Sequence, residues 1–152
     1  MKYCTFFGHS DCPDHILPVL RETVERLILA READAFLVGN HGNFDALVKK
    51  VLREMSQKYP YVSYFVVLSH MPRKGYEEAE HTLLPEGIEA VPPRFAICYA
   101  NEWMLKRAEI CVTYVTRSFG GAARYAKRAA DSGKAVIDLA RRAEVRWEQD
   151  KP

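Results

Sequence analysis

The sequence predicts one α/β domain with a Rossmann-like, doubly wound and mostly parallel sheet of about five strands and helices on both faces. Short apolar runs rich in β-branched residues alternate with segments of helical spacing along the 152 residues. Near the C-terminus, the run 110–115 is followed by Gly120 and Gly121, an alanine-rich helical segment, and a second apolar run ending at Leu139. This order is typical of a β-α-β unit. The length supports a single domain with one sizeable core.

The first half of the chain predicts three strands and two helices. Strand 3–7 runs into a glycine turn, and Ser10 or Asp11 is expected to cap the helix that follows. After strand 35–38, Asn43 is expected to cap a strongly amphipathic helix that stops before a proline and leads into the third strand, 62–68. The first helix has one apolar face with a spacing of three or four residues: Ile16, Leu20, Val24, Leu27 and Ile28.

The second half begins with an irregular stretch, 69–94, that is rich in proline and glycine and contains an acidic patch at 77–80. A connection of this length is either a lid or binding loop or a solvent-exposed excursion with a short extra strand near 88–91. A helix is expected over 93–108, before the β-α-β unit.

We assign 1–152 to one domain, with its core at 3–139 and a tail helix at 140–150. Ala143, Val145 and Trp147 are the apolar anchors of this tail, and we expect the tail helix to pack on the body or on a neighbouring subunit. Self-association as a homo-oligomer is therefore expected.

Composition excludes several classes of protein. No apolar run is long enough to span a bilayer, and the chain enters directly into a strand pattern, so we expect a cytoplasmic protein with no membrane partner. The net charge of +2 does not favour a nucleic-acid partner. The four cysteines are expected to be reduced thiols. His9, Cys12 and His15 have an H-x-x-C-x-x-H spacing without a fourth ligand, so no metal site is predicted.

Three glycine-bearing turns follow the first, second and fourth predicted strands. Ligands of open α/β sheets bind beyond the carboxyl ends of the strands, where these turns converge. A glycine pair that opens a helix lets a phosphate approach the first N–H groups of that helix. None of the turns is a G-x-G-x-x-G or P-loop motif. The residues expected to bind the ligand are Gly8, His9, Gly39, Asn40, Gly42, Thr116, Arg117, Ser118, Gly120 and Gly121, with Arg94 and Asn101 as further candidates beside the long loop.

Several segments together resemble one known superfamily. They are 5–9 (TFFGH), 38–45 (VGNHGNFD), 93–97 (PRFAI) with 101–104 (NEWM), and 112–123 (VTYVTRSFGGAA). The chain resembles the SLOG superfamily over almost its whole length, and within it a bacterial branch of small single-domain proteins. The superfamily has a Rossmann-like fold. It includes the "lonely guy" phosphoribohydrolases, the DNA-processing protein of bacterial transformation, and domains proposed to sense nucleotide derivatives related to NAD or ADP-ribose.

The resemblance implies nucleotide-phosphate binding but not the phosphoribohydrolase reaction. In those enzymes the glycine turn reads P-G-G-x-G-T-x-E-E and an R-K-x-x-M segment precedes it, with the arginine and a glutamate serving catalysis. The positions that match are Gly120, Gly121 and Met104. Among the positions that differ, Ala100 stands in place of the arginine, Asn101 in place of the lysine, and Ala126 and Lys127 in place of the two glutamates. Both catalytic groups of that family are therefore absent.

Three functional hypotheses follow. The first is a binding or sensing module for a nucleotide or nucleotide-sugar phosphate such as AMP, ADP-ribose or NAD, with no required cofactor. The second is an N-glycosidic hydrolase that uses Asp45, Asp11 or His9 as acid or base. The third is a nucleic-acid-associated protein, which has support only from the nine Lys and Arg against five Asp and Glu in 117–152.

Overall fold

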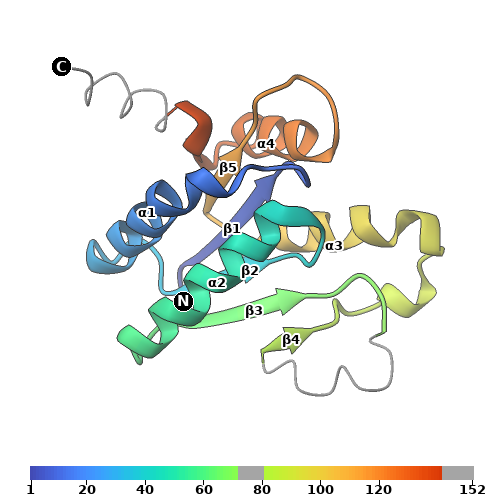
Figure 1. Ribbon diagram of the computed structural model, residues 1–152. Coiled ribbons are helices and arrows are strands. Elements are labelled where there is room, and N and C mark those ends of the chain that lie inside the picture. Colours follow the sequence, from blue (N-terminus) through green and yellow to red (C-terminus); the bar gives the residue numbers. More distant parts are fainter. Residues whose placement is uncertain (72–80, 142–152) are drawn as a thin grey trace.

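The computed structural model of the protein describes residues 1–71 and 81–141. Within these ranges, six parallel strands form one sheet in the order β4-β3-β2-β1-β5-β6 (Figure 1). Its strands are β1 (Tyr3–Gly8), β2 (Ala35–Val38), β3 (Ser63–Val67), β4 (Thr82–Leu83), β5 (Ile110–Tyr114) and β6 (Ala135–Asp138). The predicted doubly wound α/β class is confirmed, with the short β4 added at one edge.

Four helices cover the sheet in the described part of the chain, two on each face (Figure 1). Helices α1 and α2 pack on one face, whereas α3 and α4 pack on the other. Their bounds are α1 (Leu17–Leu29), α2 (Gly42–Lys58), α3 (Ala96–Arg107) and α4 (Gly121–Asp131). Short 3-10 turns occur at Asp14–Ile16, Ile88–Ala90 and Pro93–Phe95.

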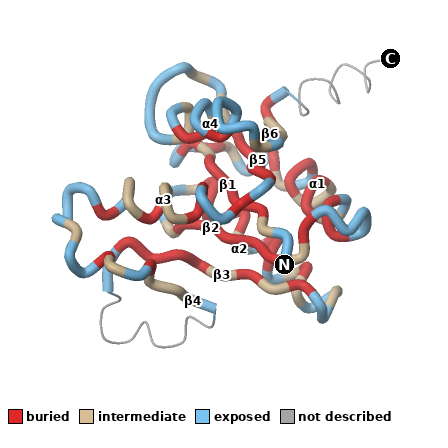
Figure 2. The backbone as a smooth tube through the Cα atoms, turned by 180° about the vertical axis from the view of Figure 1, so that it is seen from behind, coloured by how far each residue is buried: buried red, intermediate tan, exposed pale blue. Residues whose placement is uncertain are grey.

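Alternate residues of each central strand enter two separate apolar cores. On β1, Cys4 and Phe6 join the core beneath α1 and α2, while Phe7 joins the core beneath α3 and α4. Figure 2 shows the central strands buried and the outer sides of the helices exposed. A strand covered on both faces has no solvent side, which explains the nearly unbroken apolar runs of the sequence.

The start of α1 differs from the prediction. Neither Ser10 nor Asp11 caps this helix, which begins at Leu17 after the 3-10 turn Asp14–Ile16 and has no side-chain cap. The Asp11 carboxylate instead accepts hydrogen bonds from Arg117, far along the chain. The predicted cap was wrong because the 3-10 turn separates the glycine turn from the helix.

The start of α2 also differs from the prediction. The helix begins at Gly42, so its N-cap position is His41 rather than Asn43. The Asn43 side chain donates to the Cys12 carbonyl oxygen at 2.6 Å and to the Asp14 carboxylate at 2.8 Å. This cap prediction was wrong because the Asn43 carboxamide is hydrogen-bonded to the turn after β1 and does not cap the helix.

The irregular stretch before α3 contains no strand near 88–91, because Ile88–Ala90 forms a 3-10 turn that follows Gly87 at φ +85°. The acidic patch 77–80 lies outside the described residues, as do Val145, Trp147 and all but the first two positions of the predicted tail helix. All four cysteines are unpaired. No helix in the described ranges combines the length and apolar character needed to cross a membrane.

Candidate functional site

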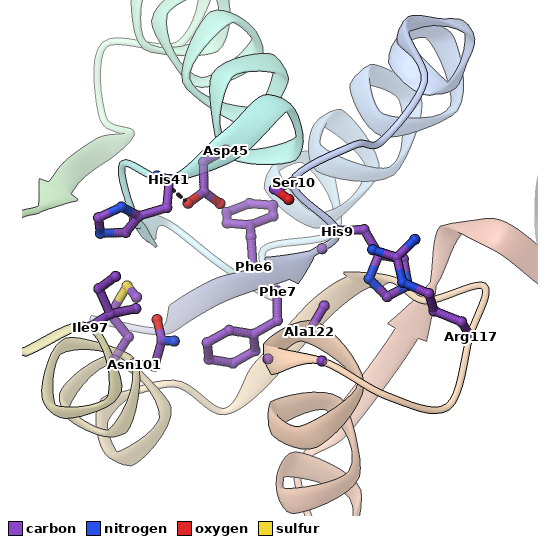
Figure 3. Close-up of a pocket in the computed structure, with 15 residues that line it drawn as sticks. Phe6, Phe7, His9, Ser10, His41, Asp45, Ile97, Asn101, Arg117 and Ala122 are labelled. Atoms are coloured by element: carbon purple, nitrogen blue, oxygen red, sulfur yellow. Dashed lines mark hydrogen bonds between the residues drawn. The ribbon is translucent and has the colours of Figure 1, made fainter. Parts of the chain in front are cut away.

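A cavity opens where the strand order reverses. The chain builds the sheet outward from β1 to β4 on one side, and then returns to place β5 and β6 on the other side of β1. Crevices of this kind are the usual ligand sites of open α/β sheets. The cavity has a volume of about 270 Å³ and is shown in Figure 3. Its lining residues are Phe6, Phe7, Gly8, His9, Ser10, Gly39, His41, Asp45, Ile97, Asn101, Met104, Arg117, Gly120, Gly121 and Ala122.

The structure brings together six of the ten residues expected to bind a ligand. The six that line the cavity lie at or just after the ends of β1, β2 and β5, as far as the first residue of α4, and they are Gly8, His9, Gly39, Arg117, Gly120 and Gly121. Asn101 lines it from α3, and Asp45 lines it from α2. The three turns therefore meet at one edge of the sheet, as their positions after parallel strands required.

The other predicted residues hold the turns in place or lie outside this cavity. Asn40 accepts a hydrogen bond from Lys49, and the backbone N–H of Thr116 donates to His9. Gly42 packs against the backbone of Ser10. Two more lie apart from the cavity: Ser118 borders a second hollow beside α4 and β6, and Arg94 lies over the ring of Phe95.

The glycine pair places the N-terminus of α4 at the cavity. Gly120 precedes the helix with φ +94°, a conformation that favours glycine, and no side chain in the described part of the chain caps the helix. The N–H groups of a first helical turn have no partner within the helix, and the helix dipole adds partial positive charge there. The arrangement can hold an anion against the backbone of Gly121 and Ala122.

Asp45 contributes a carboxyl group to the cavity wall that α2 provides. The residue is only 9% exposed, and one of its oxygens, Oδ2, accepts a hydrogen bond from the His41 N–H at 3.0 Å. The other oxygen has no hydrogen-bond partner among the described residues. Burial raises the pKa of Asp45 to about 6, although the His41 N–H and the nearby Lys49 oppose that rise. The carboxyl group can therefore exchange a proton near neutral pH.

Gly39 makes room for this carboxyl group. A Cβ atom at position 39 would lie 2.9 Å from Oδ2 of Asp45. Figure 3 shows Asp45 projecting from α2 toward the cavity, with His41 beside it. The glycine at 39 therefore serves the placement of Asp45, in addition to lining the cavity itself.

His9 is a neutral residue that joins two turns. Its Nε2 atom accepts the Thr116 N–H at 3.0 Å, so the neutral tautomer carries its proton on Nδ1. Burial lowers the pKa of His9, and the positive charge of Arg117 lowers it further. Protonation of Nε2 would break the bond to Thr116, so this atom is a poor candidate for a general base.

Arg117 pairs with Asp11 at the rim of the cavity. Its two terminal nitrogens each donate to one carboxylate oxygen at 3.1 Å. The hydrogen bonds from Arg117 lower the pKa of Asp11, which is exposed. Asp11 is therefore an ionised partner of the arginine and does not line the cavity, whereas Asp45 does.

A polar chain at the edge of the cavity includes two residues, Ser69 and His70, that the sequence did not indicate. His41 Nε2 lies 3.0 Å from the Ser69 hydroxyl, which lies 2.7 Å from His70 Nδ1. Desolvation lowers the pKa of His41, and His70 and Lys49 lower it further. Ser69 and His70 follow β3 closely, so the rule that polar residues after parallel strands gather at one edge would have found them.

The His, Cys, Asp and Glu side chains of the described residues do not indicate a metal centre. Among residues 1–71 and 81–141, no group of three or more His, Cys, Asp or Glu side chains is arranged to hold a metal ion. Cys12 directs its sulfur toward the Pro13 carbonyl oxygen, and His9 is held by Thr116. Comparison of the sequence with protein-family models finds no match, and comparison with curated proteins finds none.

Proposed function

We propose that this protein binds the phosphate-bearing end of a nucleotide or nucleotide sugar in the cavity at the ends of β1 and β5. The phosphate lies against the first N–H groups of α4, and the rest of the ligand extends toward α2 and α3. The uncapped helix, the glycine pair and the position at the strand-order reversal all support this assignment. The resemblance to the SLOG superfamily is consistent with it.

The observation that carries the proposal is the glycine at position 121. Gly121 is helical, its φ is not positive, and a Cβ atom there would meet no described residue within 4 Å. Glycine in the middle of a helix costs about 0.5 to 1 kcal/mol relative to alanine, and at the first residue of α4 it also brings no gain in stability. Neither backbone conformation nor packing within the described residues requires this glycine. Close approach of a ligand to the backbone explains it.

Replacing Gly121 by aspartate is expected to abolish ligand binding without lowering stability. The new carboxylate occupies the space proposed for the phosphate and repels it. An acidic side chain in the first helical turn is favourable, so the unliganded variant is expected to be more stable than the wild type by about 0.3 to 1 kcal/mol. Melting temperatures measured with AMP, ADP-ribose and NAD test both effects. A ligand at one hundred times its Kd stabilises the wild type by about 2.7 kcal/mol.

Gln57→Glu is the matched control because it changes the net charge by the same amount at an exposed position near the far end of α2. This variant is expected to keep the ligand-induced rise in melting temperature. An equal rise in wild type and Gly121→Asp would reject the site. Absence of a rise in the wild type with every nucleotide would reject the proposed function.

The second candidate function is hydrolysis of an N-glycosidic bond in the same cavity, and Asp45 favours it. Its carboxyl group is buried, faces the cavity and has a pKa of about 6. In this reaction water attacks the anomeric carbon, the bond to the base breaks, and the base takes the electron pair and a proton. Asp45 would accept the proton from water or donate one to the base.

Chromatography of a wild-type sample incubated with AMP distinguishes binding from hydrolysis. Released adenine and ribose 5-phosphate would identify an enzyme, and Asp45→Asn is expected to lose that release while still binding AMP. Intact AMP after prolonged incubation would exclude hydrolysis of AMP and would be compatible with binding alone. Release that persists in Asp45→Asn would exclude this carboxyl group as the acid or base.

We also propose a cytoplasmic location and self-association. The four unpaired cysteines fit a reducing compartment. Homo-oligomer formation rests on the apolar tail residues, which lie outside the described part of the chain. A single-chain mass in sedimentation at micromolar concentration would contradict self-association.

A further inference from the structure

Asn101 occupies a distinctive place on the wall that α3 contributes to the cavity. Ile97, Asn101 and Met104 all line the cavity, and their spacing of four and three residues puts them on one face of the helix. Met104 is fully buried, while Ile97 is 44% exposed. Asn101 is half-buried between them. One polar side chain therefore stands in an otherwise apolar strip.

The carboxamide of Asn101 has no hydrogen-bond partner among the described residues, and it is not among the groups with further interactions. The side chains of Asn40 and Asn43, by contrast, are both hydrogen-bonded to other residues. A carboxamide offers two donors and one oxygen acceptor. Its position facing a cavity leaves this capacity available to a ligand.

We propose that Asn101 reads the edge of the ligand's base, and that this base carries an amino group beside a ring nitrogen, as adenine does. This inference rests on the proposed function. The carboxamide oxygen accepts from the amino group, and the carboxamide nitrogen donates to the ring nitrogen. The apolar side chain of Ile97 covers the ring next to this polar contact.

The distribution of charge around the cavity favours an amino-substituted ring over one with two adjacent acceptors. On the edge that carries N7, a 6-oxopurine presents two adjacent acceptors, O6 and N7, which arginine or lysine pairs best. Arg117 is the only such cation among the described lining residues, and it is paired with Asp11. Figure 3 shows Arg117 on the opposite side of the cavity from Ile97 and Asn101. The α3 wall therefore offers a carboxamide and no cation.

The test compares three probes by calorimetry: AMP, purine riboside 5′-monophosphate, which lacks the amino group, and ribose 5-phosphate, which lacks the base. The wild type is expected to bind AMP about fivefold more tightly than purine riboside 5′-monophosphate, because one hydrogen bond is lost. Asn101→Leu is expected to bind these two nucleotides equally and to bind ribose 5-phosphate as the wild type does. Leucine is a strong helix former and suits the apolar strip, so the variant is expected to fold.

Each result bears on a different claim. Wild-type preference for AMP that persists in Asn101→Leu would overturn the role of Asn101. Loss of ribose 5-phosphate binding in this variant would also overturn it, because Asn101 would then support the phosphate site. Equal wild-type affinity for AMP and purine riboside 5′-monophosphate would reject the base preference but keep the phosphate site. If no probe binds the wild type, the proposed function itself fails.

Discussion

Replacing Asp45 by asparagine is expected to raise the free energy of unfolding by about 2 to 3 kcal/mol at pH 8. The pKa of the buried carboxyl group is raised from 3.8 to about 6, so at pH 8 the folded protein holds an ionised group that burial disfavours. Asparagine has a similar shape, carries no charge, and keeps an oxygen that can accept the His41 N–H.

The gain depends on pH in a defined direction. Because the folded-state pKa lies above the unfolded value, folding takes up a proton between pH 3.8 and about 6. The stability that this proton contributes is fully present below pH 3.8 and is lost as the pH rises through about 6. The gain in the free energy of unfolding of Asp45→Asn over wild type is therefore complete at pH 8, falls steadily below pH 6, and disappears at about pH 3.

Urea unfolding of wild type and Asp45→Asn at pH 8, 6, 5 and 4 measures this dependence. Asp131→Asn is the matched control, since Asp131 is exposed and paired with Lys127 on the same helix. Its free energy of unfolding is expected to stay close to that of the wild type at each pH. Equal stability of Asp45→Asn and wild type at pH 8 would show that the Asp45 carboxyl group is well solvated.

A carboxyl group that lowers stability at neutral pH calls for a functional explanation. Asp45 is almost completely buried, with only 9% of the residue exposed, and yet it makes only one hydrogen bond with the described residues. Sites that bind or transform ligands commonly retain such groups at the expense of stability. If Asp45→Asn gains stability and loses base release, the acid or base of the second candidate function is identified.

The sheet was predictable because its two faces are both covered. This arrangement produces continuous apolar runs such as 110–115, and in the sequence a glycine-bearing turn follows three of them. The short β4, Thr82–Leu83, was not predictable, because two residues give no periodic pattern. The convergence of the turns after β1, β2 and β5 followed from the parallel order alone.

The roles of individual polar residues were less predictable. Asn43 has the local sequence context of a helix cap, yet its side chain contacts residues 31 and 29 positions earlier in the chain. Asp45 lies in the first turn of α2, where aspartate is common for reasons of helix stability. Its burial depends on how α2 packs over Gly39, which is a tertiary contact. Local patterns therefore located the site but did not assign its side chains.

Replacing Gly42 by alanine is expected to lower the free energy of unfolding by about 3 kcal/mol. Gly42 has φ +84°, and a Cβ atom there would lie 2.4 Å from the Cα atom of Ser10. The alanine variant combines a left-handed backbone with a clash against backbone atoms of Ser10, in the turn after β1. The neighbouring Asn43 N–H donates to the Ser10 carbonyl oxygen at 2.8 Å, so the two turns cannot separate without losing this bond.

Gly133→Ala separates the two causes of the expected loss of stability, which are the left-handed backbone and the clash with the turn after β1. Gly133 has φ +82°, but a Cβ atom there would meet none of the residues that the structure describes within 4 Å, so this variant carries the backbone strain without the clash. Its expected loss is about 1 kcal/mol, measured by urea unfolding beside Gly42→Ala. Equal losses in the two variants would mean that the β1 turn moves aside freely. A larger loss in Gly42→Ala, with weaker nucleotide binding by the folded variant, would show that contact between the β1 and β2 turns sets the shape of the cavity.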